Sequence, residues 1–443
     1  MLKTFVIGGI HPPENKISAG KKIENLPLPS IVVIPVSQHI GAPAKVIVNK
    51  GDKVKTGQLI AESGGFVSSN THSSVSGTVL KVDSFMDSSG YRKLAVQIQV
   101  EDDIWMEDID RTEDLKVDFA FSSEEIIKKI NEKGLVGLGG ATFPSHVKLS
   151  VPQGKKAEFL IINGVECEPF LTSDHALMLQ KGPEIITGIK IMMRALHVEN
   201  AIIGIENNKP DAIKLMSELV ASESGIRVQG LKVKYPQGGE KQLIAAILGR
   251  EVPSGGLPID IGVIAFNVGS VFAVYQAVQK NRPLIERVVT VTGKSLTNPS
   301  NFLARIGTPV QSLIEAAGGL PEDTGKIVSG GPMMGKAIGT MDVPVVKGTS
   351  GVLVFPESES RRNEAANCIR CAKCVEVCPM GMEPYLLMNF TEKELYGRAE
   401  IEKIMDCMEC GSCSFICPSN RPLLDFVRLG KNKVGQLIRA RKN

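Results

Sequence analysis

Eight of the nine cysteines fall within one stretch of the chain and repeat a single spacing twice. Both copies read C-x2-C-x2-C-x3-C followed by proline. A 4Fe–4S cube needs four thiolates; a tight C-x2-C-x2-C turn supplies three, and the fourth comes from elsewhere in the fold. The repeat therefore predicts two 4Fe–4S clusters. Their predicted metal ligands are Cys368, Cys371, Cys374, Cys378, Cys407, Cys410, Cys413 and Cys417.

The same spacing occurs in two-cluster bacterial ferredoxins, and this resemblance implies that the two motifs exchange their fourth cysteine. Zinc is disfavoured because zinc sites usually pair one C-x2-4-C with a distant second pair. A disulfide framework is disfavoured because the pattern lies in a long chain without a secretory signal. The implied ligand groups are Cys368, Cys371, Cys374 with Cys417, and Cys407, Cys410, Cys413 with Cys378.

Composition predicts a soluble protein with several domains. The chain has 443 residues, of which 43% are hydrophobic and 22% charged, enough for about three or four domains. A net charge of +3 argues against a nucleic-acid partner. The uncharged span Ile261–Gln279 approaches the length of a membrane helix. Its glycines and polar residues instead favour a strand over Gly262–Val268 and a helix after Gly269, so no transmembrane helix is expected.

The first hundred residues predict an extended leader and a small barrel. Residues 1–30 contain four prolines and little periodicity, which favours a segment that wraps the rest of the fold. Residues 31–101 read as short strands separated by turns. The stretches GDKVKTGQLIAE and HSSVSGTVLKV resemble the barrel-sandwich domains of biotinyl and lipoyl carriers. No lysine for a prosthetic arm lies between Glu62 and Val79, so a structural or docking role is favoured over a carrier role.

After an acidic linker, residues 119–285 alternate strands with helices, which predicts an α/β domain. A helix over Ser122–Lys133 has a serine cap and acidic residues in its first turn. The later predicted strands are Phe159–Asn163, Ala201–Glu206 and Arg227–Tyr235, and the predicted helices are His175–Leu196, Asp211–Ala221 and Glu240–Leu248.

The remaining chain predicts two further domains. Residues 286–355 are rich in strands and fit a small β-grasp module. Residues 363–430 form the two-cluster ferredoxin domain, with predicted helices over Glu383–Phe390 and Glu392–Asp406. Residues 431–443 form a basic tail, which is either a solvated surface or a docking site for an acidic partner.

The segment Gly134–Lys148, GLVGLGGATFPSHVK, is a glycine-rich loop. Its backbone N–H groups could cradle a phosphate, with Lys148 as the counter-charge. It is not a dinucleotide fingerprint, because Thr142 stands where the third glycine should be and a helix precedes it. Taken alone, the loop could equally be a tight packing turn.

Four stretches of this chain, in order, resemble the flavin-bearing, NADH-oxidising subunit of respiratory complex I. They are the glycine loop, IINGVECEP (161–169), YPQGGEKQL (235–243) and FNVGSVF (266–272). Together with the GGIHPPENK opening and the doubled cysteine motif, the whole chain resembles the C subunits of Rnf electron-transport complexes. This resemblance implies a multidomain α/β and β fold: a lipoyl-like barrel-sandwich domain, an α/β flavin and NADH domain, a β-grasp SLBB-like module and a helical two-cluster ferredoxin domain.

The resemblance also implies residues for FMN and NAD(H). In complex I subunits the loop carries an arginine and the asparagine is followed by an aspartate; here Leu138 and Val165 occupy these places, and Gly239 replaces one of two acids. Cys167 is interpreted as a buried thiol. FMN is implied at Gly139, Gly140 and Lys148, with Asn163, Glu166 and Asn267 around the flavin, and the nucleotide at Phe143, Glu168 and Glu240.

The implied function is electron transfer between NAD(H) and single-electron carriers. The chain would be a peripheral subunit on the cytoplasmic face of the cell membrane, working with ferredoxin and with other Rnf subunits that translocate ions. Two alternatives stay open. One is a soluble NADH-dependent flavin and iron–sulfur reductase, such as a cobalamin reductase, and the other is an electron-wire subunit whose α/β domain has lost its nucleotide.

Overall fold

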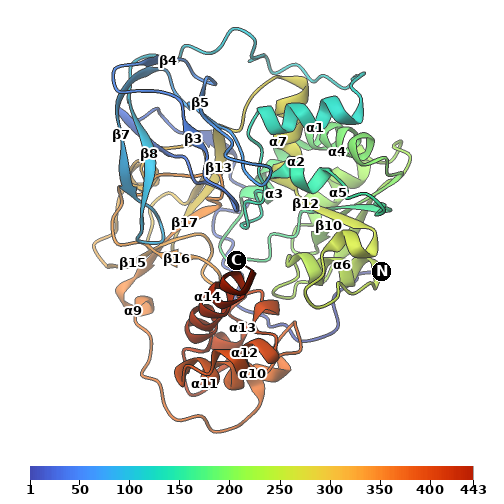
Figure 1. Cartoon of the computed structure of the whole chain (residues 1–443), viewed down its shortest axis with the longest axis vertical. Helices are drawn as coiled ribbons and strands as arrows, with labels where there is room; N and C mark the ends of the chain where they lie inside the picture. The colour runs from blue at the N-terminus through green and yellow to red at the C-terminus, as the bar shows by residue number, and fades with distance from the viewer. Residues whose placement is uncertain (443) are drawn as a thin grey trace.

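The computed structural model describes residues 1–442, and the N-terminal segment runs extended across several later elements (Figure 1). Lys3 forms a β-bridge with Leu231, and Ile10 forms one with Tyr235. Strand β1 (Ile23–Asn25) then pairs in parallel with β14 (Ser300–Arg305). The predicted leader therefore contacts both the α/β domain and the β-grasp sheet.

The barrel-sandwich domain consists of two antiparallel sheets that pack around alternating apolar side chains. Val32, Ile34, Val96 and Ile98 are fully buried between them. The barrel-sandwich fold predicted for this region is confirmed. One sheet has the order β2 (Ile31–Pro35), β8 (Arg92–Val100), β7 (Gly77–Met86), β4 (Lys53–Val54); the other has β3 (Lys45–Val46), β5 (Leu59–Glu62), β6 (Thr71–His72).

The α/β domain is built on a four-stranded sheet in which every strand is parallel to its neighbours. Three of its strands are buried, largely apolar runs, as expected for a parallel sheet covered on both faces. The edge strand over Ile226–Leu231 also carries Arg227 and Gln229. Because all strands point the same way, their carboxyl ends meet at one edge, where Asn163 pairs with Asn267. The order is β11 (Ile226–Leu231), β10 (Asn200–Glu206), β9 (Phe159–Asn163), β12 (Val263–Asn267).

The uncharged span forms the predicted strand and helix, β12 followed by α7 (Val268–Gln279), after a short 3-10 helix over Pro258–Ile261. Within residues 1–442, no helix combines the length and the apolar character needed to cross a bilayer.

The helices of this domain follow the predictions with one correction. Helix α1 (Ser123–Glu132) has a complete capping box between Ser122 and Glu125. The single helix predicted over His175–Leu196 is wrong, because the chain breaks at Lys181 and restarts with Pro183 in the first turn, where its missing N–H is harmless. The others are α2 (Ser145–Leu149), α3 (Ser173–Gln180), α4 (Gly182–Leu196), α5 (Pro210–Leu219) and α6 (Glu240–Leu248).

The β-grasp module is a mixed sheet with α8 (Val310–Ala316) packed against it. The leader strand β1 forms one edge of this sheet, so the first and third quarters of the chain are joined there. The order is β1, β14, β13 (Glu286–Thr292), β17 (Gly351–Pro356), β15 (Thr324–Ser329), β16 (Lys336–Ala337).

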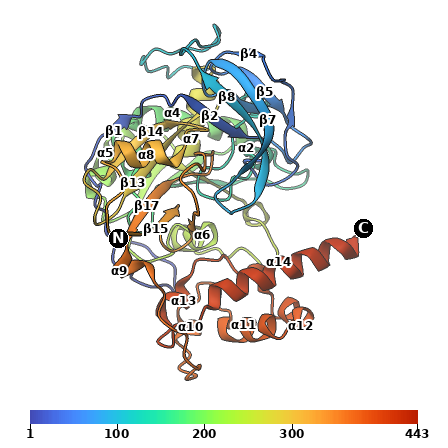
Figure 2. The same ribbon diagram turned by 90° about the vertical axis from the view of Figure 1, so that its left-hand side faces the viewer.

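The cysteine motifs lie in a helical lobe below the other domains (Figures 1 and 2). The helix predicted over Glu392–Asp406 is wrong, because left-handed residues Glu394 and Lys403 interrupt it. The predicted basic tail, as far as it is described, continues the final helix, whose Val434 is buried against Leu387. The helices of the lobe are α10 (Lys373–Glu376), α11 (Pro384–Glu392), α12 (Tyr396–Ile401), the 3-10 turn Ile404–Asp406, α13 (Ser412–Ile416) and α14 (Leu423–Lys442). The short helix α9 (Glu357–Ser360) precedes the lobe and packs against β15 and β17 of the β-grasp sheet.

Candidate functional site

The glycine loop forms a hairpin at the carboxyl edge of the parallel sheet, where ligands of open α/β sheets usually bind. Val136 bridges Pro144, and the Gly137 N–H donates to the Phe143 carbonyl at 2.8 Å. Both ends are buried, whereas Gly139 and Gly140 at the centre are exposed.

Each of the two central glycines has a physical reason to be glycine. Gly140 adopts a left-handed φ of 107°, and a side chain there would point into open space. A Cβ on Gly139 would lie 3.3 Å from the Asn267 Cβ, so only a residue without a side chain packs there comfortably. Exposed backbone N–H groups beside bare glycines fit a phosphate group, which is the end of FMN that such a loop would hold.

Lys148 and Glu240 meet beside this loop. The Lys148 Nζ lies 2.5 Å from Glu240 Oε1 and 5.1 Å from the centre of the Phe266 ring. Both side chains are partly exposed, so their ion pair contributes little stability and either group is free to exchange its partner for a ligand. Two residues predicted for different parts of the site are thus adjacent in space.

Two asparagines end neighbouring strands at the same edge. Asn163 donates to the Gly238 carbonyl at 2.8 Å. Asn267 caps α7 by accepting from the Gly269 N–H, and its amide donates to Asp174 Oδ2 at 2.6 Å. Desolvation, with Glu166 nearby, raises the pKa of Asp174 to about 7. Sequence reasoning missed Asp174, because acidic residues are common in the first turn of a helix and its neighbours in the sequence give no sign of a role in a site.

Glu166 caps a helix. Its carboxylate accepts from the backbone N–H groups of Asp174 at 2.8 Å and His175 at 3.2 Å, at the beginning of α3. The residue holds a left-handed φ of 47°, which is uncommon for a side chain with a Cβ. The structure therefore places Glu166 at the site edge with its oxygens already engaged.

Glu168 is also engaged by the protein. Its two carboxylate oxygens accept the N–H groups of Met333 and Met334, at 3.1 and 2.8 Å, from the β-grasp module. Desolvation raises the pKa of Glu168 to about 7. From the leader, Lys16 Nζ donates to the carbonyls of Glu166, Glu168 and Leu171 at 2.7–2.9 Å. Sequence reasoning missed Lys16, whose role depends on contacts about 150 residues away along the chain.

We therefore expect Glu168→Ala to affect stability more than nucleotide use. Losing two hydrogen bonds to a partly buried carboxylate should lower Tm by about 2–4 °C. Because the pKa is raised from 4.5 to about 7 on folding, the stabilisation is full below pH 4.5 and declines as pH rises through 7. Thermal scans at pH 5 and pH 8 should show the larger difference from wild type at pH 5. An increase in the NADH KM with an unchanged Tm would contradict this expectation.

Four cysteines surround one mainly apolar cavity in the helical lobe. Cys378 from the first motif lies with Cys407, Cys410 and Cys413 from the second around about 410 Å³ of space, including its open mouth. Burial raises the pKa of Cys407 to about 11 and of Cys413 to about 12. Thiolates in such a place need positive charge close by, which the irons of a cluster supply, so the donor set fits a 4Fe–4S group.

Backbone N–H groups already point at two of these sulfurs. Met382 N lies 3.4 Å from Cys378 Sγ, and Glu409 N lies 3.4 Å from Cys407 Sγ. Such hydrogen bonds tune the reduction potential of iron–sulfur clusters. Within residues 1–442, no three Cys, His, Asp or Glu side chains are placed to hold a single metal ion.

The other cysteines lie nearer the surface. Cys374 is close enough to Cys368 and Cys417 for their charges to raise its pKa, although desolvation is the largest cause. Cys368 and Cys371 are exposed, within a run of exposed residues from 361 to 373. One cysteine group is thus buried and the other faces solvent.

The loop between β11 and α6, residues 232–239, packs directly on the buried cysteine group. Tyr235 donates its hydroxyl to the Cys410 carbonyl at 2.8 Å. A Cβ on Gly239 would lie 2.5 Å from the Met408 Cε, so Gly239 lies against the end of the Met408 side chain. Gln242 of α6 donates to the Pro379 carbonyl at 3.1 Å. These contacts join elements separated by more than a hundred residues, and no sequence signal announces them.

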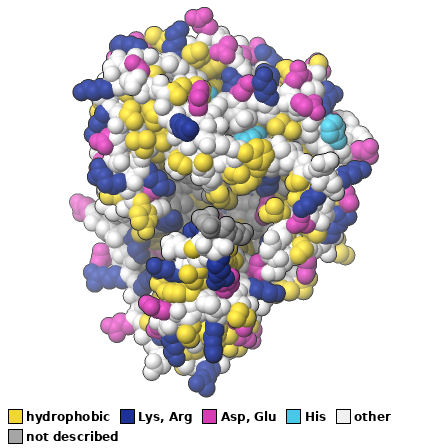
Figure 3. Space-filling model, viewed as in Figure 1, with side chains coloured by type: hydrophobic (Ala, Val, Ile, Leu, Met, Phe, Trp, Pro, Cys, Tyr) yellow, Lys and Arg dark blue, Asp and Glu magenta, His cyan; other side chains and the backbone are white. Residues whose placement is uncertain are grey.

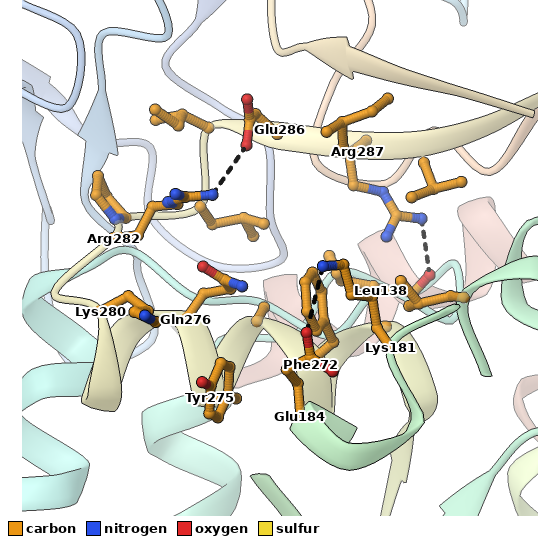
Figure 4. A pocket seen from close by; sticks show the side chains of 18 of the residues that line it. Leu138, Lys181, Glu184, Phe272, Tyr275, Gln276, Lys280, Arg282, Glu286 and Arg287 are labelled. Carbon is orange, nitrogen blue, oxygen red and sulfur yellow. Dashed lines mark hydrogen bonds and ion pairs between the residues drawn. The ribbon is translucent and has the colours of Figure 1, made fainter. Parts of the chain in front are cut away.

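A large cavity lies next to this site without coinciding with it (Figure 4). It encloses about 960 Å³, including its mouth, between α7, the beginning of α4 and β13. Leu138, Asp174 and Gly269 line it, but none of the nine residues predicted for FMN and NAD(H) does. The cavity is thus a neighbour of the predicted site and is not that site.

Four family models match the chain in the order of its domains. They are the RnfC barrel sandwich hybrid domain (residues 4–103), the Nuo51 FMN-binding domain (130–276), the SLBB domain (288–337) and the 4Fe-4S dicluster domain (360–418). The predicted domain types and their order are confirmed by these matches and by the structure.

The fold is also similar to that of chains in two structures of NAD+-reducing NiFe hydrogenase. In the H2-reduced state the TM-score is 0.50 at 18% identity, covering 70% of this chain and 60% of that one. In the air-oxidised state the TM-score is 0.51 at 16% identity, covering 71% and 66%. At this identity the similarity concerns the fold alone.

Curated relatives are similar over nearly the full length. The C subunit of the proton-translocating ferredoxin:NAD(+) oxidoreductase complex of Clostridium ljungdahlii is 44% identical over 98% of this chain and 94% of that protein. The Na(+)-translocating counterpart of Acetobacterium woodii is 43% identical over 96% of both chains. The C subunit of the ion-translocating oxidoreductase complex of Rhodobacter capsulatus is 40% identical over 98% of this chain and 84% of that protein. The chain therefore belongs to the family of C subunits of Rnf-type ion-translocating oxidoreductase complexes.

Proposed function

We propose that this chain exchanges hydride with NAD(H) at an FMN and passes single electrons through two 4Fe–4S clusters. It does so as a peripheral subunit on the cytoplasmic face of a membrane-bound Rnf-type complex. Ferredoxin is the external electron partner, and the other subunits translocate ions. The family relationship favours this assignment over a soluble reductase, because the relatives named above are subunits of complexes.

The observation that carries the proposal is the contact between the candidate nucleotide site and the buried cysteine group. FMN, when bound, accepts two electrons as hydride and releases them singly, and 4Fe–4S clusters take one electron at a time. Tyr235, Gly239 and Gln242 hold the two sites against each other without an intervening layer. The protein thus supplies the short path that such an exchange needs.

The roles of individual residues follow from this arrangement. Gly139 and Gly140 present backbone N–H groups, and Lys148 supplies charge, for the FMN phosphate. Phe143, which closes the hairpin of the glycine loop, and Glu240, which pairs with Lys148, are assigned to the nucleotide. Asn163, Glu166 and Asn267 shape the edge of the flavin pocket. We assign Glu168 to fixing loop 164–172, because its oxygens are engaged.

The cysteine geometry supports an order for the clusters. Cys378, Cys407, Cys410 and Cys413 hold the inner cluster, beside the α/β domain. Cys368, Cys371, Cys374 and Cys417 hold the outer cluster, whose exposed cysteines face the external carrier. In this order the inner cysteines would hold the cluster next to the flavin, and the outer cysteines would hold the cluster that exchanges electrons with the external carrier.

An anaerobic absorption spectrum with and without NADH tests the proposal. We expect NADH to bleach a bound flavin and then the broad iron–sulfur absorption of the full chain. Glu240→Ala should raise the NADH KM while leaving iron content unchanged. A flavin that NADH does not reduce would reject the catalytic assignment and favour the electron-wire alternative. If a pull-down from the membrane fraction recovered this chain without partner subunits, the soluble reductase would be favoured.

A further inference from the structure

The loop between β5 and β6 of the barrel, residues 63–70, packs against the α/β domain. The Phe66 carbonyl lies 3.0 Å from His146 Nε2, and the two rings meet edge to face at 6.1 Å. Asn70 donates its amide to the Glu132 carbonyl at 3.1 Å, at the end of α1. This loop lies within the lysine-free segment noted in the sequence. A carrier arm needs a mobile tip, whereas here the tip region is held by a neighbouring domain.

A buried lysine from the β-grasp module joins the same place. Lys347 lies between β16 and β17 and is only 1% exposed. Its Nζ donates to the carbonyls of Asn70 and Gly134, both at 2.7 Å. Gly134 is the first residue of the glycine loop, and its φ of 68° and its approach to the Asn70 carbonyl leave no room for a side chain. One side chain therefore links the barrel, the β-grasp module and the beginning of the glycine loop.

Further contacts reach the middle and the far end of the loop. The Ile40 N–H of the barrel donates to the Thr142 carbonyl at 3.3 Å. The guanidinium of Arg287, on β13, lies 3.5 Å from the Leu138 carbonyl (Figure 4). His146, which meets Phe66, lies within the last turn of this segment. The loop is thus held from outside at both ends and near its centre, while Gly139 and Gly140 stay exposed. The face of the molecule drawn in Figure 3 carries lysine, arginine, aspartate and glutamate side chains interspersed with hydrophobic ones.

We propose that the barrel-sandwich domain is a fixed clamp that, with Lys347, holds the glycine loop in its phosphate-binding conformation. This inference rests on the proposed function, because it takes the loop to be the FMN site. A loop ordered before binding does not lose conformational entropy when the ligand binds, so a clamp raises affinity without touching the ligand. Lys347 is accordingly a positioning residue. The lipoyl-like fold is retained here for its packing surface and not for a prosthetic arm.

The test compares Lys347→Met with Lys280→Met in the full chain with clusters in place. Lys280 is a matched control, since it is 3% exposed and bonds Asp110 and Thr112, both at 3.1 Å, away from the loop. After removal of flavin, FMN affinity is measured by fluorescence quenching. Hydrogen exchange is measured at the Gly137, Leu138 and Ser145 amides, which bond within or beside the loop.

Lys347→Met is expected to raise the FMN Kd about tenfold and to speed exchange at these three amides. Lys280→Met should lower Tm while leaving both quantities unchanged. Unaltered affinity and exchange in Lys347→Met, or an equal loss in both variants, would overturn the clamp. If Lys347→Met does not fold, His146→Phe tests the contact between the barrel and the end of the glycine-loop segment. This variant keeps the ring contact and removes the hydrogen bond to the Phe66 carbonyl. Wild-type protein that binds no FMN would reject the flavin site, while hydrogen exchange would still test the clamp.

Discussion

Replacing Cys378 with alanine is expected to remove the inner cluster, although Cys378 belongs to the first motif in the sequence. Its sulfur lines the same cavity as Cys407, Cys410 and Cys413. A 4Fe–4S cube is held by four thiolates, and we expect the buried site to lose the cluster when one is removed, so that iron falls from about eight to about four per chain. Because the proposed path places this cluster between the flavin and the outer cysteines, NADH-driven reduction of an external acceptor should be lost.

The matching variant in the second motif is Cys417→Ala. Its expected effect is loss of the outer cluster only, with the inner one still reduced by NADH. Iron analysis and low-temperature EPR of the two variants distinguish these outcomes. Cys167→Ala is the control, because the ninth cysteine packs against Gly238 outside both groups and should leave the iron content unchanged. If Cys378→Ala and Cys368→Ala removed the same cluster, the exchange of the fourth cysteine would be disproved.

The sequence predicted the features that depend on local spacing. Cysteine spacing defined the cluster motifs, and the serine and glutamate around residue 122 defined the first helix to within a residue. Buried apolar runs indicated the parallel strands over Phe159–Asn163 and Ala201–Glu206. The strand predicted over Arg227–Tyr235 instead ends at Leu231. Errors arose where a single backbone angle decided the outcome, as at Lys181, Glu394 and Lys403. The break at Lys181 had a local signal, because Gly182 and Pro183 follow it and a glycine–proline pair marks a turn. The residues next to Glu394 and Lys403 contain no comparable pair.

The contacts that assemble the site could not have been read from the sequence. Tyr235 reaches Cys410, Lys16 reaches three carbonyls of loop 164–172, and Lys347 reaches Gly134. Each of these is a polar group bonded to a backbone carbonyl, which carries no side-chain signature. The predicted role of Glu168 illustrates the limit: its motif indicated a nucleotide contact, yet its carboxylate binds the backbone of the β-grasp module. A motif selects the residues of a site, but the tertiary fold decides which of them stay free.

The positive charge of Lys148 remains available to a ligand, and the substitution Lys148→Met should cause the largest loss of FMN affinity. In the free protein its ammonium pairs with Glu240, which is partly exposed. A phosphate at Gly139 and Gly140 would offer it a stronger, charge-assisted partner. Removing the charge should therefore raise the FMN Kd about a hundredfold, or ~2–3 kcal/mol, as measured by flavin fluorescence with iron content unchanged.

Lys155→Met is the control for this loss, because Lys155 forms a comparable, partly exposed ion pair with Asp260. An equal decrease in both variants would show that only net charge matters. Glu240→Gln separates the two partners further. It releases Lys148 from its ion pair, so FMN should bind as tightly or more tightly, while NADH binding should weaken. If Glu240→Gln weakened FMN as much as Lys148→Met, the pair would be a structural unit, and the phosphate would have to be held by the loop backbone alone.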